Sequence, residues 1–439
     1  MPKSKKILFI ALFFVLGIIL AEEISVSFFG LYVVTIAGVV IWFLFDSDFK
    51  RFLAVLFLFF LAGIWRMELA QFFKEKSFKL VQDINFKEDL IFKGIVFREP
   101  EIKNKQQDIM IKTPQKEVVL VKTLASFLYL YGDELEIVCH PGKTKKKTTY
   151  QKDFTKENAS IICYYPKINL LARGKGDWVY GKILSFRQKS RFIVQKFLPP
   201  PESHLLAAML LGYKKEISRL QKEKFSRAGL SHIVAISGMH LGILSFILFY
   251  FFILAGLWRQ QALGAVIIFL WFYIAMIGFP ASALRAGVMI SALALGWFWG
   301  RISGLINVLV WTGIFLLFIN PFLLKDIGFE LSFLAVGGIV YLLPVFFYFF
   351  RYCPNLWGLK KIFLVTLSAQ IFTLPLAVYY FGNMPVLSIL ANLSIIPLLP
   401  FILILGIYGF SNKKFNASVI FMKNISAKIL PYFYCFDIF

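Results

Sequence analysis

Two histidines and two serines lie close together in residues 229–242, which read GLSHIVAISGMHLG. His232, Ser237, Gly238 and His240 stand at the start of a stretch whose hydropathy predicts a membrane-spanning helix. Polar side chains inside a membrane are costly, so they are functional candidates by default. Ser237 and Gly238 weaken the helix here, and an interrupted helix at membrane depth usually lines a water-filled cavity because its freed backbone groups need partners. The alternative is a packing seam in which small residues let helices approach closely.

A serine and a histidine one helical turn apart could also act as a nucleophile and its base. An intramembrane hydrolase that uses Ser237 with His240, or with His232, is therefore an alternative, although no third catalytic partner can be identified. Metal chemistry has less support, because the four histidines of the chain form neither a His-Glu-x-x-His motif nor a dense cluster with acidic residues. We expect no metal site and no cofactor.

Further polar residues interrupt later apolar segments. Arg285 could extend its side chain to the membrane interface or face an internal lumen. Asp326 and Glu330 are four residues apart and share a helix face, where they could pair with Lys325 or Arg285. Asn392 could bridge helices or face the same cavity. We predict that these residues line one polar path together with the 229–242 segment.

The composition predicts the kind of protein that must position these side chains. Of 439 residues, 59% are hydrophobic and only 17% are charged, whereas soluble domains carry about 25% charged residues. This excludes an ordinary soluble enzyme, a disordered chain and a disulfide-rich secreted module. The expected fold class is a polytopic α-helical membrane protein with an inserted extracytoplasmic β-barrel domain of the small, OB type.

Residues 1–70 should form three transmembrane helices, and residues 229–439 about seven to eight more. The last segment, 415–438, either spans the membrane or lies in its interface. Lys and Arg in the short loops place the N-terminus in the cytoplasm and residues 71–178 outside, by the positive-inside rule. The expected location is the cytoplasmic membrane. The predicted spans are 7–21, 28–45 and 52–70, then 231–256, 262–279, 282–299, 304–319, 327–350, 361–381 and 386–410.

Residues 71–178 contain five short β-rich runs separated by turn residues, which is typical of a small β-barrel. Cys139 and Cys163 each lie at the end of a predicted strand. Because this domain is expected outside the cytoplasm, the two cysteines are a candidate disulfide, with buried free thiols as the alternative. The predicted strands are 90–98, 108–112, 117–122, 134–139 and 159–165.

Residues 179–228 carry eleven Lys and Arg against three Glu, within a chain whose net charge is +23. The segment is helical in pattern but too polar or too short to span, which indicates amphipathic or re-entrant helices. A basic outer surface attracts polyanions, either nucleic acid or the headgroups of membrane lipids. The candidate nucleic-acid contacts are Lys182, Arg187, Lys189, Arg191, Lys196, Lys214, Lys215, Arg219, Lys222, Lys224 and Arg227.

Four sequence strings in this order resemble the ComEC family of competence proteins, the DNA-uptake channels of bacteria. They are GLSHIVAISGMHLG at 229–242, PASALRAGVM at 280–289, NPFLLKDIGFELSFLAVGGI at 320–339 and LANLSIIPLLP at 390–400. With the three N-terminal spans and the β-rich domain, the resemblance covers nearly the whole chain. The polar residues singled out above match the family's motif residues by position: His232, Ser237, Gly238, His240, Arg285, Asp326, Glu330 and Asn392.

The resemblance implies a channel that passes single-stranded DNA across the cytoplasmic membrane during transformation. It also implies an outer DNA receptor and a cytoplasmic helicase-type ATPase as partners. Many family members continue into a metallo-β-lactamase-like nuclease domain, whose His-x-His-x-Asp-His motif is not found in this sequence. Either a separate protein supplies the nuclease, as a partner, or this is a truncated or split family member. In both cases we expect no nuclease activity in this chain. A transporter of a small anion or lipid precursor is a further alternative, although no internal repeat is evident.

Overall fold

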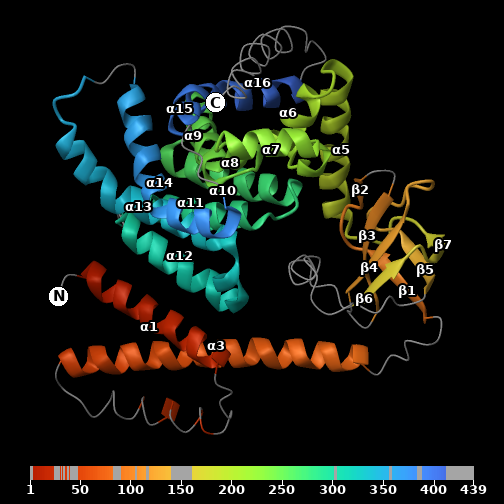
Figure 1. The fold of residues 1–439 in the computed structure, drawn as a ribbon, viewed down its shortest axis with the longest axis horizontal. Coiled ribbons are helices and arrows are strands. Elements are labelled where there is room, and N and C mark those ends of the chain that lie inside the picture. Colours follow the sequence, from red (N-terminus) through yellow and green to blue (C-terminus); the bar gives the residue numbers. More distant parts are fainter. Residues whose placement is uncertain are drawn as a thin grey trace. The chain divides into compact units, whose positions relative to one another are not determined.

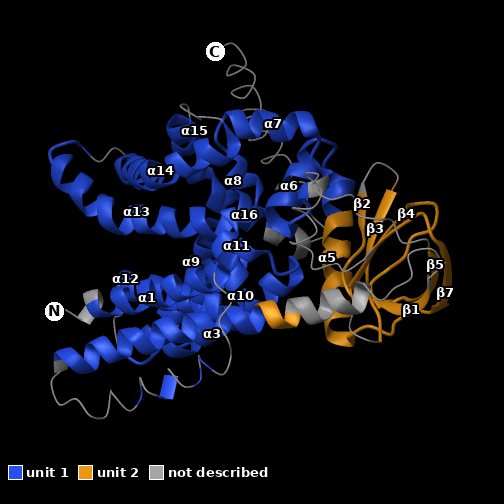
Figure 2. Ribbon diagram, turned by 60° about the horizontal axis from the view of Figure 1, so that its bottom comes forward, with its two compact units in different colours: residues 1–70, 193–439 blue, residues 71–192 orange. Residues whose placement is uncertain are grey.

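The computed structural model describes residues 3–23, 48–82, 90–103, 106–114, 118–139, 161–300, 304–354, 358–382 and 388–411, with a few single positions between 30 and 39. The chain divides into two compact units, residues 1–70 with 193–439 and residues 71–192 (Figure 2). The predicted helix at 28–45 lies largely outside the described residues, and the segment at 415–438 lies wholly outside them.

Two N-terminal helices, α1 (Lys3–Glu23) and α3 (Asp48–Gln82), cross closely (Figure 1). A Cβ atom on Gly17 of α1 would lie 2.0 Å from the carbonyl oxygen of Phe60, and one on Gly63 of α3 would lie 2.2 Å from that of Phe14. Glycine at both positions therefore allows the two backbones to touch, as small residues do where membrane helices cross.

The sheet of the second unit has seven strands, two more than predicted, in the order β6-β4-β3-β1-β5-β7 with β2 paired to β3. The β4–β6 pair is parallel and the other pairs are antiparallel, so the sheet is mixed. No pairing joins β6 to β7 among the described residues, so the predicted barrel is not shown. The strands are β1 (Leu90–Val96), β2 (Glu101–Lys103), β3 (Gln106–Lys112), β4 (Val118–Leu124), β5 (Glu134–Cys139), β6 (Ile161–Tyr164) and β7 (Lys167–Ala172).

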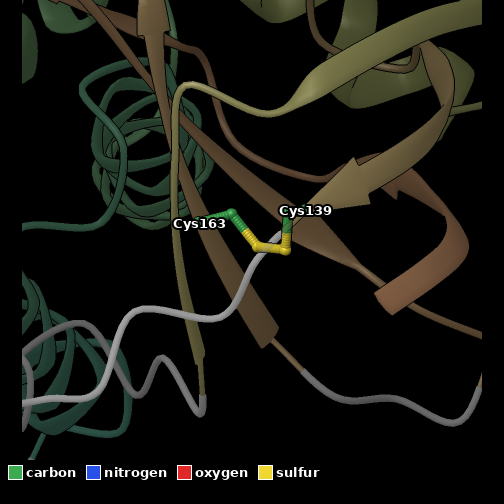
Figure 3. Close-up of a disulfide and its surroundings, with 2 residues drawn as sticks. All are labelled: Cys139 and Cys163. Carbon is green, nitrogen blue, oxygen red and sulfur yellow. A yellow bond between two sulfur atoms is a disulfide. The ribbon is translucent and has the colours of Figure 1, made fainter. Parts of the chain in front are cut away.

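The core of this sheet follows the two-residue period of its strands, because alternate side chains point to the same face. Ile109 with Ile111 and Leu135 with Ile137 are fully buried in one cluster. Cys139 and Cys163 lie in the same cluster and are joined by a disulfide (Figure 3). This is the pairing that the sequence offered as a candidate, and it connects the ends of two strands that are not neighbours in the sheet.

The basic segment forms helices, as its pattern predicted. α5 (Trp178–Phe197) is amphipathic and α6 (Glu202–Leu211) is almost wholly buried. A short 3-10 helix, η1 (Lys214–Glu216), leads to α7 (Arg219–Arg227), which has no buried residue. The burial of α6 within the protein explains how a helix too short to span can lie among membrane helices.

Six described helices are long and apolar enough to cross a membrane, namely those at 49–73, 259–276, 281–298, 327–349, 359–381 and 388–406. The helices from residue 231 onward are α8 (Ser231–Val234), α9 (Gly238–Leu254), α10 (Arg259–Met276), α11 (Ala281–Phe298), α12 (Leu305–Ile319), α13 (Ile327–Phe349), α14 (Leu359–Phe381), α15 (Ser388–Ile395) and α16 (Leu399–Ser411), with 3-10 turns η2 (Pro321–Lys325) and η4 (Ile396–Leu398).

Contacts between distant parts of the chain hold these helices together. Arg66 of α3 donates to the carbonyl groups of Phe318 and Ile319 at the end of α12. Such a cation satisfies carbonyls that the helix end leaves without partners. Lys325 pairs with Glu22 of α1, so the N-terminal helices are joined to the α12–α13 connection.

We expect the α13–α14 pair to depend on Gly338, because a Cβ atom there would lie 2.4 Å from the carbonyl oxygen of Ser368. Gly338→Ala should lower the free energy of unfolding by about 1–3 kcal/mol through overpacking. The neighbouring Gly337 has nothing within 4 Å of its Cβ position, so Gly337→Ala is the matched control. Thermal unfolding of the detergent-purified protein measures both, and equal melting temperatures for the two variants would contradict this packing.

Candidate functional site

The structure shows the predicted interruption in the helical segment at 231–256. α8 ends at Val234 and α9 begins at Gly238, with Ala235 and Ser237 in extended conformation between them. The carbonyl of Ile236, which no helix can satisfy, accepts a hydrogen bond from the Ser282 hydroxyl of α11 at 2.8 Å. A Cβ atom on Gly238 would lie 3.4 Å from that of Ala286, so α11 packs directly on the start of α9.

Ser237 and His240 are brought together at this interruption. The Ser237 hydroxyl lies 2.9 Å from Nδ1 of His240, and the Ser237 backbone N–H donates to the same nitrogen at 3.3 Å. This is the geometry of a helix cap, in which a side chain in the first turn accepts from the backbone before the helix. His240 is only 1% exposed, whereas His232 in α8 is exposed.

Arg285 lies about one helical turn beyond Ser282 on α11, is buried, and does not extend toward a surface. Its Nη2 donates to the carbonyl of Gly328 at 2.7 Å, and its Nη1 lies 4.0 Å from Oδ1 of Asp326. Asp326 in turn caps α13, because its Oδ1 accepts from the backbone N–H of Phe329 at 2.8 Å. Of the two partners that the sequence allowed for Asp326, the structure selects Arg285, since Lys325 pairs with Glu22.

The structure does not gather every predicted residue at one point. Glu330 lies in the first turn of α13 and is half-buried. Asn392 is buried in α15, and its Oδ1 has no hydrogen-bond partner among the described residues. α11 is the element in common, because it contacts the start of α9 through Ser282 and the start of α13 through Arg285.

The sequence predicted close helix packing at Ser282 but no hydrogen-bonding role for it, and Ser245 was not singled out. Ser282 closes the interruption from a separate helix, and Ser245 of α9 is buried with its hydroxyl unpartnered among the described residues. A serine among alanines, as in the sequence around 282, was the available signal, but the sequence alone cannot say which carbonyl it reaches.

The basic residues at 179–228 divide into exposed and engaged groups. Lys182, Lys189 and Lys196 are exposed on α5. Arg187 is buried and pairs with Glu99 at 2.9 Å, so it anchors α5 to the turn between β1 and β2 rather than facing a ligand. Arg219 pairs with Glu223 on the surface of α7. Lys222 and Arg227 are exposed on α7. Arg191, Lys214 and Lys224 are half-buried. The side chain of Lys215 lies outside the described residues.

Within the part of the chain that the structure describes, no group of three or more histidine, cysteine, aspartate or glutamate side chains is placed to hold a metal ion. The polar groups at the interruption, Ser237, His240 and Ser282, take part in hydrogen bonds with each other or with the backbone. Hydroxyl, imidazole and guanidinium groups of this kind can position a polar or anionic ligand.

An interrupted apolar helix, a buried arginine and six described helices that could span a membrane are the features of a multi-pass membrane protein. The Competence protein family model matches residues 209–429, half of the chain, and the chain belongs to that family. It is also 26% identical over 336 residues to ComE operon protein 3 of Bacillus subtilis (strain 168). That alignment covers 72% of this chain and 41% of the relative, so the chain spans well under half the relative's length. No solved structure matches the chain.

The two roles of Asp326 can be separated by substitution. Asp326→Ala removes the cap of α13 and the charge beside Arg285, and it should lower the free energy of unfolding by about 1–2 kcal/mol from the cap alone. Asp326→Asn keeps an oxygen that can accept from Phe329, so its loss should be smaller. Thermal unfolding in detergent compares the two. If Asp326→Asn destabilises as much as Asp326→Ala, the charge beside Arg285 is the larger contribution and the cap assignment is wrong.

Proposed function

We propose that this chain is a channel for single-stranded DNA in the cytoplasmic membrane, which acts in the uptake of DNA during natural transformation. Membership of the Competence protein family supports the role in competence. The β-sheet unit would lie outside the cytoplasm, and the polar interruption at α8–α9 would line the path of the strand. An outer DNA receptor, a separate nuclease and a cytoplasmic helicase-type ATPase would complete the system, the ATPase supplying the energy.

The single observation that best supports DNA as the ligand is the exposed face of α5. Lys182, Lys189 and Lys196 recur every seven residues and therefore lie on one face, about 10.5 Å apart along the helix. Trp178 and Phe192 lie on the same face and are 70% and 68% exposed. A stacked strand advances about 3.4 Å per nucleotide, so successive lysines could meet about every third phosphate.

The arrangement of aromatic and basic side chains distinguishes nucleic acid from a membrane surface. An interfacial helix places its apolar side chains on one face and its charges on the other. On the exposed face of α5, lysines and aromatic rings are interleaved, and the Lys182 ammonium lies 3.7 Å from the centre of the Trp178 ring. Proteins that bind single strands combine a basic track with aromatic platforms on which bases stack. The face therefore suits a strand better than it suits lipid.

The geometry gives little support to a hydrolase at Ser237. A nucleophilic serine needs a base that is oriented by a third group. Nδ1 of His240 is already shared between the backbone N–H and the hydroxyl of Ser237, which is the arrangement of a helix cap. A cap accounts for both contacts without a catalytic role.

Replacing Lys182, Lys189 and Lys196 with glutamine should weaken binding of single-stranded DNA and reduce its salt dependence. Three lost phosphate contacts lower the slope of log K against log salt concentration by about 2. Fluorescence anisotropy of a labelled oligothymidylate with detergent-purified protein measures both quantities.

The matched control replaces three other exposed bases, Arg259, Arg351 and Lys361, with glutamine. The proposed orientation would put all three on the cytoplasmic side, away from incoming DNA. The control has the same net charge as the α5 variant. If both variants lose the same affinity and slope, the effect comes from net charge and α5 is not the binding surface.

Trp178→Ala should remove one stacking platform while leaving every lysine in place. Base stacking on an aromatic ring contributes about 1–3 kcal/mol, so the affinity should fall about 5-fold to 150-fold with an unchanged salt slope. Val179→Ala, next to it and also exposed, is the control. Retained affinity in Trp178→Ala would exclude stacking at this position, and binding of vesicles of anionic lipid, measured in parallel, would reveal an interfacial helix instead.

A further inference from the structure

His240 carries a buried ring nitrogen, Nε2, that forms no hydrogen bond within the described part of the chain. Its Nδ1 receives the backbone N–H of Ser237, and a backbone N–H can only donate. Nδ1 of the neutral ring is therefore unprotonated, and the ring proton is on Nε2. The backbone of Ile233 lies near this ring, but no described group has the geometry of a hydrogen bond to Nε2. A buried polar group without a partner calls for an explanation, such as a missing ligand.

The groups around this donor are basic. Both His232 of α8 and Lys214 of η1 lie within electrostatic range of His240. Packing brings these elements together, because Ile217, just after η1, and Val234 of α8 belong to one buried cluster. Lys214 is half-buried and forms no ion pair within the described part of the chain. Burial without a counter-charge lowers the pKa of its ammonium group.

The start of α9 adds to the same field. The capping contact turns the imidazole back over the first turn of this 17-residue helix. The first N–H groups of a helix have no partner within the helix, and its dipole favours negative charge there. Helix N–H groups, a ring N–H and an ammonium group are all donors, so the arrangement suits an oxyanion.

We propose that His240, His232 and Lys214 form a binding site for a phosphodiester group at the start of α9. His232 is exposed and lies at the rim, whereas His240 is buried at the base of the site. The source of the phosphodiester is taken to be the transported DNA strand. This choice of source rests on the proposed function, because the headgroup of a phospholipid also contains a phosphodiester.

The four histidines of the chain make this site directly observable. Ring-labelled histidine gives one set of NMR signals per residue in the full-length, detergent-purified protein. Addition of oligothymidylate should shift the His240 and His232 signals and leave that of His204, on α6, in place. Lys214→Gln should raise the oligothymidylate concentration needed for the His240 shift about tenfold, as expected for one lost charge-assisted contact.

Two variants of His240 separate ligand binding from capping. His240→Asn keeps an acceptor near the Nδ1 position for Ser237 but loses the Nε2 donor, whereas His240→Gln places an amide N–H near the Nε2 position. The His232 shift should weaken strongly in His240→Asn and be partly restored in His240→Gln. Equal weakening in both, with an unchanged melting temperature, would overturn the assignment of Nε2 as the donor.

The control ligands distinguish the possible sources. Phosphatidylglycerol in mixed micelles should leave the His240 signal unchanged; a shift with this lipid and none with oligothymidylate would overturn the assignment to DNA. Fluorescence anisotropy could show that oligothymidylate binds and that the α5 lysines are needed, while no histidine signal moves. That result would refute the site at α9 and leave the proposed function standing. If oligothymidylate does not bind at all, the proposed function fails as well.

Discussion

The hydrogen bond from Ser282 to the carbonyl of Ile236 is the interaction on which the arrangement of the polar residues depends. A helix interrupted among apolar neighbours leaves backbone groups that water cannot reach, and each must find a partner inside the protein. Ser282 supplies one from α11, and His240 supplies another from the first turn of α9. Arg285 of α11 also bonds to Gly328 at the start of α13. The two hydrogen bonds from α11 therefore fix the starts of α9, α11 and α13 relative to one another.

Local chemistry explains why much of this could be read from the sequence. Ser237 and Gly238 interrupt an apolar run at the point where the helix breaks, and the strands of the second unit alternate buried and exposed side chains. Signals of this kind need only neighbouring residues. β2 and β7 escaped prediction because one has three residues and the other follows β6 after a two-residue connection. Whether a sheet closes into a barrel depends on pairing between distant strands, which no local pattern contains.

Side-chain partners were predictable only where few choices existed. The sequence offered Asp326 two possible cations, and it could not foresee that Glu22, about three hundred residues away, occupies one of them. Arg187 illustrates the same limit. Its position in a basic stretch suggested a ligand contact, yet Glu99 neutralises it. A buried charge is retained only with a partner, since removing either one leaves an uncompensated charge, so burial rather than charge decides which bases are available.

The two basic regions differ in a way that suits successive steps on one polyanion. On α5 the lysines are exposed and interleaved with aromatic rings, so each contact is screened by salt and exchanges rapidly. At the start of α9 the donors are few, partly buried and fixed by capping, so screening is weaker and geometry is more demanding. Within the described residues, neither the α5 lysines Lys182, Lys189 and Lys196 nor Lys214 forms an ion pair with an acid. A surface that gathers a flexible strand needs the first kind of contact, and a narrow path that admits one phosphodiester at a time needs the second.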